Sequence, residues 1–344
     1  MSKVFINSFS QISVQKPFSE EWKNCPLSFD GQKLVRIQDP DFKEFLPSAV
    51  CRRNGKILKR AILVSNKALE ASGLDSVDAV VTGTGLGCVE NTEAFLQDLL
   101  HNGEEFLKPS LFMQSTHNTV SSTIGINLKC HGYNSTYCHN GVSFESALLD
   151  VFLQIQMGRI NSAFVGGFDE MSQTYFQILE HQGYLGGDSK GFAGESACGC
   201  VVSTQKTDNA LCEISAVRMC NRVSADDLER ELQHTLTDAG IQMSDIDAIM
   251  TGINGKPEND AVYYKNLEYW FADKPVLQYA NIFGESYSGF VYGCYASAVS
   301  LQDGCIPDVL FVEKTDSNSL CPNNILLYHH FAERDHAFIV LRKC

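Results

Sequence analysis

A cysteine at the end of an expected strand is the best candidate for a reacting group in this sequence. The segment Ser135–Leu149 reads STYCHNGVSFESALL, in which strand-like residues lead into Cys138 and then into a helix. A thiol at the head of a helix lies near the positive end of the helix dipole and near unpaired backbone N–H groups. These lower its pKa and can form an oxyanion hole. The pattern favours a nucleophile, although an arbitrary member of a set of thirteen cysteines is more often simply packed.

Histidines and one glutamate are candidates for acid–base chemistry in the same site. His139 follows Cys138 directly, but adjacent helical side chains point about 100° apart, so it need not reach the thiol. Glu285 could act as a base or, in a dry pocket, as a proton donor. For each imidazole, a packed or surface position is the simpler interpretation. The last segment of the chain contributes three more histidines: His329, His330 and His336.

The loops that carry these residues follow strands in repeated units. Ala68–Gly87 and Thr235–Gly255 each read as a helix ending at a glycine, an acidic linker, an apolar run and a Thr-Gly loop. Ser146–Val165 and Tyr292–Val312 each read as a helix, a glycine and an apolar strand. Loops at the carboxyl ends of parallel strands meet at one edge of the sheet, so we expect them to build one site.

The repeats predict an α/β protein with two pseudo-duplicated βα halves and mostly parallel sheets covered by helices. We place the halves at residues 1–206, which carry Cys138, and 207–344. Thirteen scattered cysteines argue against a disulfide framework and for a reducing compartment. Without a long apolar run or a secretory signal, we expect a soluble, cytoplasmic protein that does not span a membrane.

Charge and motif spacing exclude several other classes of function. A net charge of −14 opposes binding to nucleic acid or to anionic membranes. Cys198 and Cys200 alternate on one strand face without a second ligand pair, so no metal site is predicted. The loop GTGLG at 83–87 lacks the spacing of a dinucleotide fingerprint.

One basic run stands out on this acidic chain. Five cations fall within Cys51–Arg60, whose sequence is CRRNGKILKR. The simpler interpretation is a solvated helix start, and the alternative is a docking site for an acidic partner or a phosphate-bearing ligand. The cations are Arg52, Arg53, Lys56, Lys59 and Arg60.

The segment around Cys138 resembles the nucleophile motif of β-ketoacyl synthases, the condensing enzymes of the thiolase fold. Ser115–Asn118, Gly158–Glu170 and Gly191–Gly199 fall into register with other stretches of that family, so the resemblance spans nearly the whole chain. It implies a thiolase-like fold with a layered αβαβα arrangement, and Cys138 as the catalytic residue. It also implies an acyl carrier protein as partner, whose phosphopantetheine arm carries the substrate, and no other cofactor.

The sequence departs from this family at two positions that matter for catalysis. Decarboxylating members carry two loop histidines that polarise the thioester carbonyl. Here the first loop, Thr251–Asp260, has Gly252 at the histidine position and Asn254 beside it, and Glu285 stands at the second histidine position. Loss of one such donor commonly costs about a hundredfold to a thousandfold in rate. Ordinary decarboxylative condensation is therefore not expected, and other pocket candidates are His139, His330 and His336.

Three functions follow from the resemblance with these departures. The first is a divergent, non-catalytic subunit, similar to a chain length factor, that pairs with an active ketosynthase in fatty acid, type II polyketide or aryl polyene synthesis. The second is a Cys138-dependent acyltransferase that acts on acyl carrier protein thioesters. The third is a module that binds an acyl chain or a protein without catalysis. The resemblance implies a homodimer or a heterodimer with a ketosynthase, and the basic run is the candidate surface for carrier docking.

Overall fold

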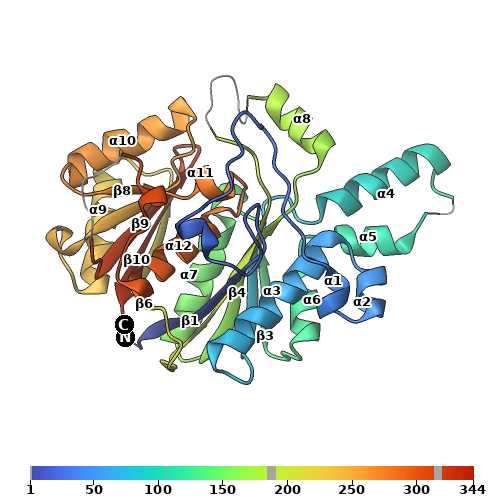
Figure 1. Ribbon diagram of the computed structural model, residues 1–344, viewed down its shortest axis with the longest axis horizontal. Coiled ribbons are helices and arrows are strands. Elements are labelled where there is room, and N and C mark those ends of the chain that lie inside the picture. The colour runs from blue at the N-terminus through green and yellow to red at the C-terminus, as the bar shows by residue number, and fades with distance from the viewer. Residues whose placement is uncertain (1, 106, 184–190, 314–319) are drawn as a thin grey trace.

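The strands of the described residues join into a ten-stranded sheet in the order β3-β2-β4-β5-β1-β6-β10-β9-β7-β8. The computed structural model describes residues 2–105, 107–183, 191–313 and 320–344 (Figure 1). The strands are β1 (Val4–Gln11), β2 (Ala79–Gly83), β3 (Tyr133–Tyr137), β4 (Ser162–Asp169), β5 (Ser196–Ser203), β6 (Cys212–Asn221), β7 (Ala248–Thr251), β8 (Val276–Gln278), β9 (Asn324–Phe331) and β10 (Asp335–Lys343).

Twelve α-helices and four short 3-10 helices accompany these strands in the described ranges. The α-helices are α1 (Phe42–Phe45), α2 (Ser48–Arg53), α3 (Lys56–Ser72), α4 (Val89–Asn102), α5 (Pro109–Ser115), α6 (Thr119–Asn127), α7 (Ser143–Gln156), α8 (Gln173–His181), α9 (Ala225–Ala239), α10 (Pro257–Phe271), α11 (Ala280–Phe283) and α12 (Phe290–Asp303). The 3-10 helices are η1 (Glu21–Lys23), η2 (Asn140–Val142), η3 (Met243–Asp245) and η4 (Asp308–Leu310). No helix of the described residues is long and apolar enough to cross a membrane.

The sheet confirms the expected duplication. Read outward from the centre, one half has the order β1-β5-β4-β2-β3 and the other has β6-β10-β9-β7-β8. Each half places its first long strand at the centre, and β1 and β6 join the halves by antiparallel pairing over Val4–Ile6. The repeat at Ala68–Gly87 and Thr235–Gly255 therefore occupies matching places in the fold, as α3 with β2 and as α9 with β7.

The expectation of mostly parallel sheets is wrong. Parallel pairing is limited to β2 with β3 and β4, and to β7 with β8 and β9. The other five pairs are antiparallel. A tight hairpin joins β9 to β10 across Ala332–Arg334, and a connection this short allows only antiparallel pairing.

The helices form three layers that alternate with the two halves of the sheet. In Figure 1, α7 and α12 lie between the halves, α3 and α6 cover one outer face, and α9 and α10 cover the other. Each helix layer has its own apolar core: residues of α7 and α12 share one cluster, those of α3 and α6 a second, and those of α9 and α10 a third. The αβαβα arrangement expected from the resemblance is confirmed.

Glycines end the helices as expected, but one predicted strand is absent. Gly73, Gly240 and Gly304 adopt the left-handed conformation at the ends of α3, α9 and α12. After Gly304, however, the apolar run to Val312 contains η4 and a single bridge between Leu277 and Phe311. Pro307 at the start of this run has no N–H to give to a sheet, and β9 occupies the equivalent place.

Candidate functional site

Cys138 follows β3 as expected, but it does not start a helix. The 3-10 helix η2 comes next, and α7 begins only at Ser143, whose hydroxyl accepts a hydrogen bond from the His139 N–H at 2.8 Å. Partial burial and the negative charge of Asp169 raise the pKa of the Cys138 thiol. The expected lowering of this pKa by a helix dipole is therefore wrong, because the dipole acts within the first turn and Cys138 lies outside it. The side chain is exposed.

Asp169, at the end of β4, ties together two of the loops that the sequence places near the site. It is fully buried and accepts hydrogen bonds from the Thr84 hydroxyl at 2.8 Å and from the backbone N–H groups of Gly85 and Leu86 at 2.9 and 2.7 Å. Its second oxygen accepts from the Ser288 N–H at 2.9 Å and from the Ser288 hydroxyl. In the sequence, this role of Asp169 is indicated by an acidic residue at the end of an otherwise apolar strand.

A cavity of about 660 Å³ lies where the loop after β7, the start of α10, the segment before α12 and the end of β9 meet. Three predicted pocket residues line it, namely Asn254, Glu285 and His330. The remaining lining residues are Gly141, Lys256, Glu258, Asn259, Ala261, Ser286, Tyr287, His329, Phe331, Ala332 and Glu333. The cavity thus lies between loops of the carboxyl-terminal half and Gly141, which is three residues after Cys138.

A buried histidine–carboxylate pair forms one wall of this cavity. The His329 ring nitrogen Nδ1 contacts Glu145 Oε1, and the ring stacks on Phe290 with centroids 4.3 Å apart and planes 6° apart. Glu145 lies on α7 and has no solvent exposure. This pairing could not be predicted from the sequence, because 184 residues separate its members. The one signal was a glutamate inside the apolar run of α7.

His329 fills the space beside Gly252. A side chain at Gly252 would place its Cβ 2.7 Å from His329 Cδ2 and 2.5 Å from the Tyr263 hydroxyl oxygen. Both distances are shorter than real Cβ contacts, so no histidine fits at Gly252 without a rearrangement. The imidazole next to this loop comes from β9 instead.

Glu285 and His330 complete the polar wall. Desolvation raises the pKa of Glu285, opposed by a hydrogen bond from Asn254 and by the attraction of His329. The Glu285 Oε2 atom is shielded from solvent and has no partner among the described residues. Burial and the neighbouring His329 lower the pKa of His330 to about 3, so it is neutral, and its Nε2 lies 3.0 Å from the Asn259 carbonyl oxygen.

Three predicted pocket residues do not line the cavity: Gly252, which lies beside His329, and the histidines His139 and His336. The His139 ring contacts the Ser146 hydroxyl at 3.1 Å and approaches Asp335 at 3.6 Å. His336 is buried against Tyr328, whose hydroxyl lies 3.2 Å from His336 Nδ1. Both imidazoles therefore have local partners and are not among the residues that line the cavity.

The basic run Cys51–Arg60 lies partly at the surface and partly in the core, so its interpretation as a docking site is wrong for Arg60. Arg60 is 2% exposed, forms a two-point ion pair with Asp39 and lies 3.2 Å from Glu195. It cannot contact a carrier protein. Lys59 stacks over the Phe42 ring at 5.0 Å. Arg52, Arg53 and Lys56 are exposed.

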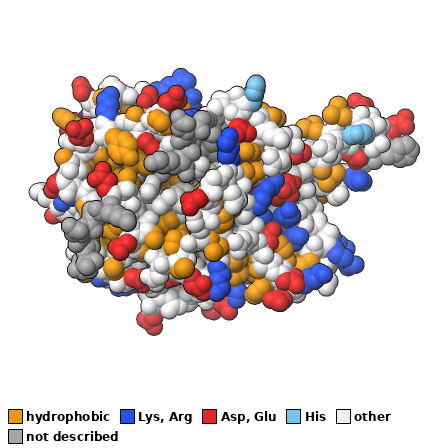
Figure 2. Space-filling view, turned by 45° about the horizontal axis from the view of Figure 1, so that its top comes forward, with side chains coloured by type: hydrophobic (Ala, Val, Ile, Leu, Met, Phe, Trp, Pro, Cys, Tyr) orange, Lys and Arg blue, Asp and Glu red, His pale blue; other side chains and the backbone are white. Residues whose placement is uncertain are grey.

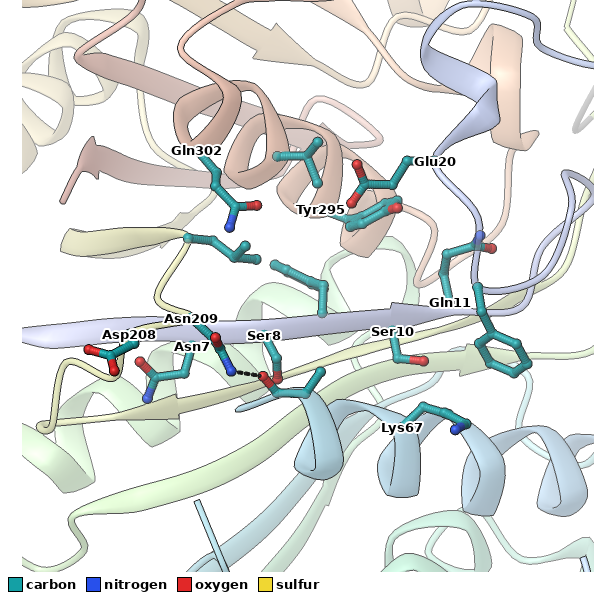
Figure 3. A pocket seen from close by; sticks show the side chains of 15 residues that line it. Asn7, Ser8, Ser10, Gln11, Glu20, Lys67, Asp208, Asn209, Tyr295 and Gln302 are labelled. Carbon is teal, nitrogen blue, oxygen red and sulfur yellow. Dashed lines mark hydrogen bonds between the residues drawn. The ribbon is translucent and has the colours of Figure 1, made fainter. Parts of the chain in front are cut away.

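A second cavity, of about 550 Å³, lies along β1 between α3 and α12 (Figure 3). Ser8 and Ser10 from β1, Lys67 from α3, and Tyr295 and Gln302 from α12 line it. It brings together none of the candidate residues found in the sequence. The described residues hold no cluster of three or more histidine, cysteine or acidic side chains arranged for a metal ion.

Comparisons with known proteins find a family model that matches part of the chain and solved structures that share the fold of all of it. Residues 38–203 match the model of the N-terminal domain of β-ketoacyl synthases. The ishigamide ketosynthase/chain length factor structure is similar over 100% of this chain and 99% of its own, with a TM-score of 0.79 and 18% identity. No curated protein matches the sequence.

Two further solved structures have the same fold. The ketosynthase ApeO in complex with its chain length factor ApeC, from Xenorhabdus doucetiae, is similar over 100% of this chain and 98% of its own, with a TM-score of 0.77 and 12% identity. A β-ketoacyl synthase from Burkholderia phymatum is similar over 100% of both chains, with a TM-score of 0.77 and 14% identity.

Proposed function

We propose that this chain is a divergent member of the β-ketoacyl synthase family, whose N-terminal domain model matches residues 38–203, and that it is a chain-length-factor-like subunit that pairs with an active ketosynthase. It would act in the cytoplasm, in fatty acid or polyketide-type synthesis. The acyl chain would arrive on the phosphopantetheine arm of an acyl carrier protein.

The observation that carries this proposal is the lack of room at Gly252. Decarboxylative condensation needs donors that stabilise a developing enolate. The imidazole of His329 and the hydroxyl of Tyr263 already fill the space beside Gly252. Glu285 occupies the position of the second loop histidine of decarboxylating synthases. The raised pKa of Cys138 also keeps its thiol protonated at neutral pH. The fold supports a subunit whose scaffold is complete and whose condensing machinery is not.

The edge of the sheet offers a place for a partner. β3 is the last strand on its side, pairs only with β2 among the described strands, and exposes Tyr133. A strand with one free edge can pair with a strand of another chain. The arm formed by α4 and α5 projects from the same half, and Figure 2 shows hydrophobic side chains on it. These include Leu100, Phe112 and Met113, which are exposed.

Carrier docking is a separate part of the proposal. The cations that remain at the surface of the basic run are Arg52, Arg53 and Lys56. The family resemblance implies an acidic acyl carrier protein as partner, so opposite charge would favour its contact with these three cations. Reversal of charge at Arg52 and Arg53 is expected to weaken carrier binding, measured by titration of the carrier at low salt. Unchanged binding would exclude this surface.

Co-expression with the ketosynthases of the source genome tests the pairing. We expect one of them to co-purify with this chain in a 1:1 complex, and we expect Tyr133→Arg to abolish the complex because it places a charge at the open strand edge. Tyr269→Arg, at an exposed tyrosine of α10 in the other half, is the matched control and is expected to leave the complex intact. Decarboxylation of a malonyl carrier protein by this chain alone would overturn the proposal.

The exposure of Cys138 supports acyl transfer as a second candidate function. A thiol that reaches solvent can accept an acyl group from a carrier without decarboxylation. Incubation with an acyl-loaded carrier and measurement of the intact protein mass would show the adduct in the wild type and not in Cys138→Ala. Absence of an adduct excludes this candidate and leaves the subunit role in place.

A further inference from the structure

We propose that the cavity at the end of β9 is a thioester-hydrolysing site, in which His329 is the general base, Glu145 is its positioning residue and Glu285 is the general acid. This activity goes beyond pairing with a ketosynthase and uses neither the partner nor Cys138. Only the substrate class, an acyl thioester, rests on the proposed function.

The contacts of His329 prepare one ring nitrogen to accept a proton. The Glu145 carboxylate holds Nδ1, so the neutral ring carries its hydrogen there and leaves a lone pair on Nε2. Stacking on Phe290 fixes the ring plane. Nε2 faces Gly252: a Cβ built on that glycine would lie 3.1 Å away. Nε2 has no hydrogen-bond partner in the described part of the chain. His329 lines the cavity, so this nitrogen is available to a water molecule.

Glu285 is suited to the opposite role. It lines the same cavity and lies close enough to His329 for their charges to interact. Desolvation raises its pKa, and its shielded Oε2 has no partner in the described ranges. A carboxyl group whose environment favours the protonated form can donate a proton while a nearby histidine accepts one. Two groups with opposed environments in one cavity are the usual arrangement of an acid–base pair.

Other titratable groups face this pair and set the background of its pH dependence. Glu145 contacts His329 from α7, Cys294 of α12 interacts with Glu145, and the Tyr263 hydroxyl of α10 lies with the His329 ring beside Gly252. His330 is its neighbour on β9 and stays neutral above a pKa of about 3. Asp260 and Lys256 act on Glu285 with opposite signs.

The proposed reaction balances without a further reagent. A water molecule attacks the thioester carbonyl carbon, a C–O bond forms, and the water proton passes to Nε2 of His329. The tetrahedral intermediate then breaks its C–S bond, and the carboxyl proton of Glu285 passes to the leaving sulfur. The products are a carboxylic acid and a thiol, and the proton on His329 returns to Glu285. No electron is transferred to or from the protein.

A small thioester tests this activity on the purified full chain without carrier or partner. With S-hexanoyl-N-acetylcysteamine as substrate, we expect hexanoate to form, measured by chromatography, above the rate in buffer. His329→Ala is expected to lower the rate about a hundredfold, the range of general-base catalysis. His234→Ala, at an exposed histidine of α9, is the matched control and keeps the wild-type rate. Absence of hexanoate with the wild type, or an unchanged rate in His329→Ala, overturns the proposal.

Two further measurements keep the test decisive if a variant fails to fold. The wild-type rate is expected to fall at high pH, where Glu285 is ionised and can no longer donate a proton; a rate that does not fall as the pH rises overturns the proposal. Glu145→Gln is expected to lower kcat and to leave KM unchanged, because the amide no longer holds Nδ1 of His329 in one tautomer, whereas a merely structural role would not separate the two constants. Loss of hydrolysis with co-purification intact would reject this site alone, and the reverse result would reject the subunit role alone.

Discussion

Gly252 is the residue at which side-chain volume decides the chemistry of the site. We expect Gly252→Ala to destabilise the protein by about 1–3 kcal/mol, because the new Cβ would lie 2.5 Å from the Tyr263 hydroxyl oxygen and 2.7 Å from the His329 ring. The measurement is the free energy of unfolding in urea, with far-UV circular dichroism as the signal.

Two variants separate this clash from a general intolerance of larger residues. Gly55→Ala meets only the flexible Asn91 amide at 3.0 Å and is expected to cost less. In the double variant with Tyr263→Phe, the atom nearest to the new Cβ is absent, so part of the loss should be recovered. An equal cost for Gly252→Ala and Gly55→Ala would show that His329 and Tyr263 do not fill this space.

Single residues were predictable where a local pattern marked them. Cys138 was found because it lies between an expected strand and an expected helix, and Glu285 because the family resemblance places it at the second histidine position. The buried pair of His329 and Glu145 was not predictable, since these two residues meet only after both halves have packed. The pKa of Cys138 was predicted in the wrong direction, because partial burial and the charge of Asp169 raise it and η2 separates the thiol from α7.

The starts of α3 and α4 share one buried carboxylate. Glu170 accepts hydrogen bonds from the Ile57 N–H of α3 at 3.1 Å and from the Glu90 N–H of α4 at 3.3 Å. Burial and the charge of Glu90 raise the pKa of Glu170 from 4.5 to about 7. The folded protein therefore binds this proton more tightly than the unfolded chain, and stability falls as the pH rises from 4.5 to 7.

Glu170→Gln removes this titration from the ends of the two helices. Relative to the wild type, we expect the variant to gain about 2–3 kcal/mol between pH 5 and pH 8, measured as the difference in the free energy of unfolding. Glu44→Gln, at an exposed glutamate of α1, is the control and is expected to show no such trend. A difference that stays constant with pH would contradict a raised pKa for Glu170.

Elements were predictable where periodicity and end signals agree. The ends of α3 and α9 at Gly73 and Gly240, and the buried strands β2 and β7, follow the repeats. The run Ile306–Val312 is equally apolar but forms η4, because Pro307 cannot donate to a sheet and β9 takes the equivalent place. Strand direction was not predictable, since it depends on which strands become neighbours.

At the scale of the molecule, the duplication was visible in the sequence because each half repeats the order of its elements. Strand order matches between the halves, with β3-β2-β4-β5-β1 on one side and β8-β7-β9-β10-β6 on the other. The contacts that join them were not visible. They include the pairing of β1 with β6, the packing of α7 on α12, and the hydrogen bonds from Ser288 to Asp169.

Asp169 is the polar part of this junction, and its removal should weaken the molecule as a whole. Asp169→Ala leaves the N–H groups of Gly85, Leu86 and Ser288 without their acceptor. An unsatisfied buried donor costs about 1–3 kcal/mol, so we expect a loss of at least about 3 kcal/mol in the free energy of unfolding.

The surface ion pair of Asp303 with Lys23 supplies the comparison, because Asp303→Ala is expected to cost less than about 1 kcal/mol. If Asp169 couples the halves, its variant should also broaden urea unfolding or split it into two transitions, since each half keeps its own apolar core. A single sharp transition with a loss no larger than that of Asp303→Ala would mean that the pairing of β1 with β6 and the packing of α7 on α12 hold the halves together without Asp169.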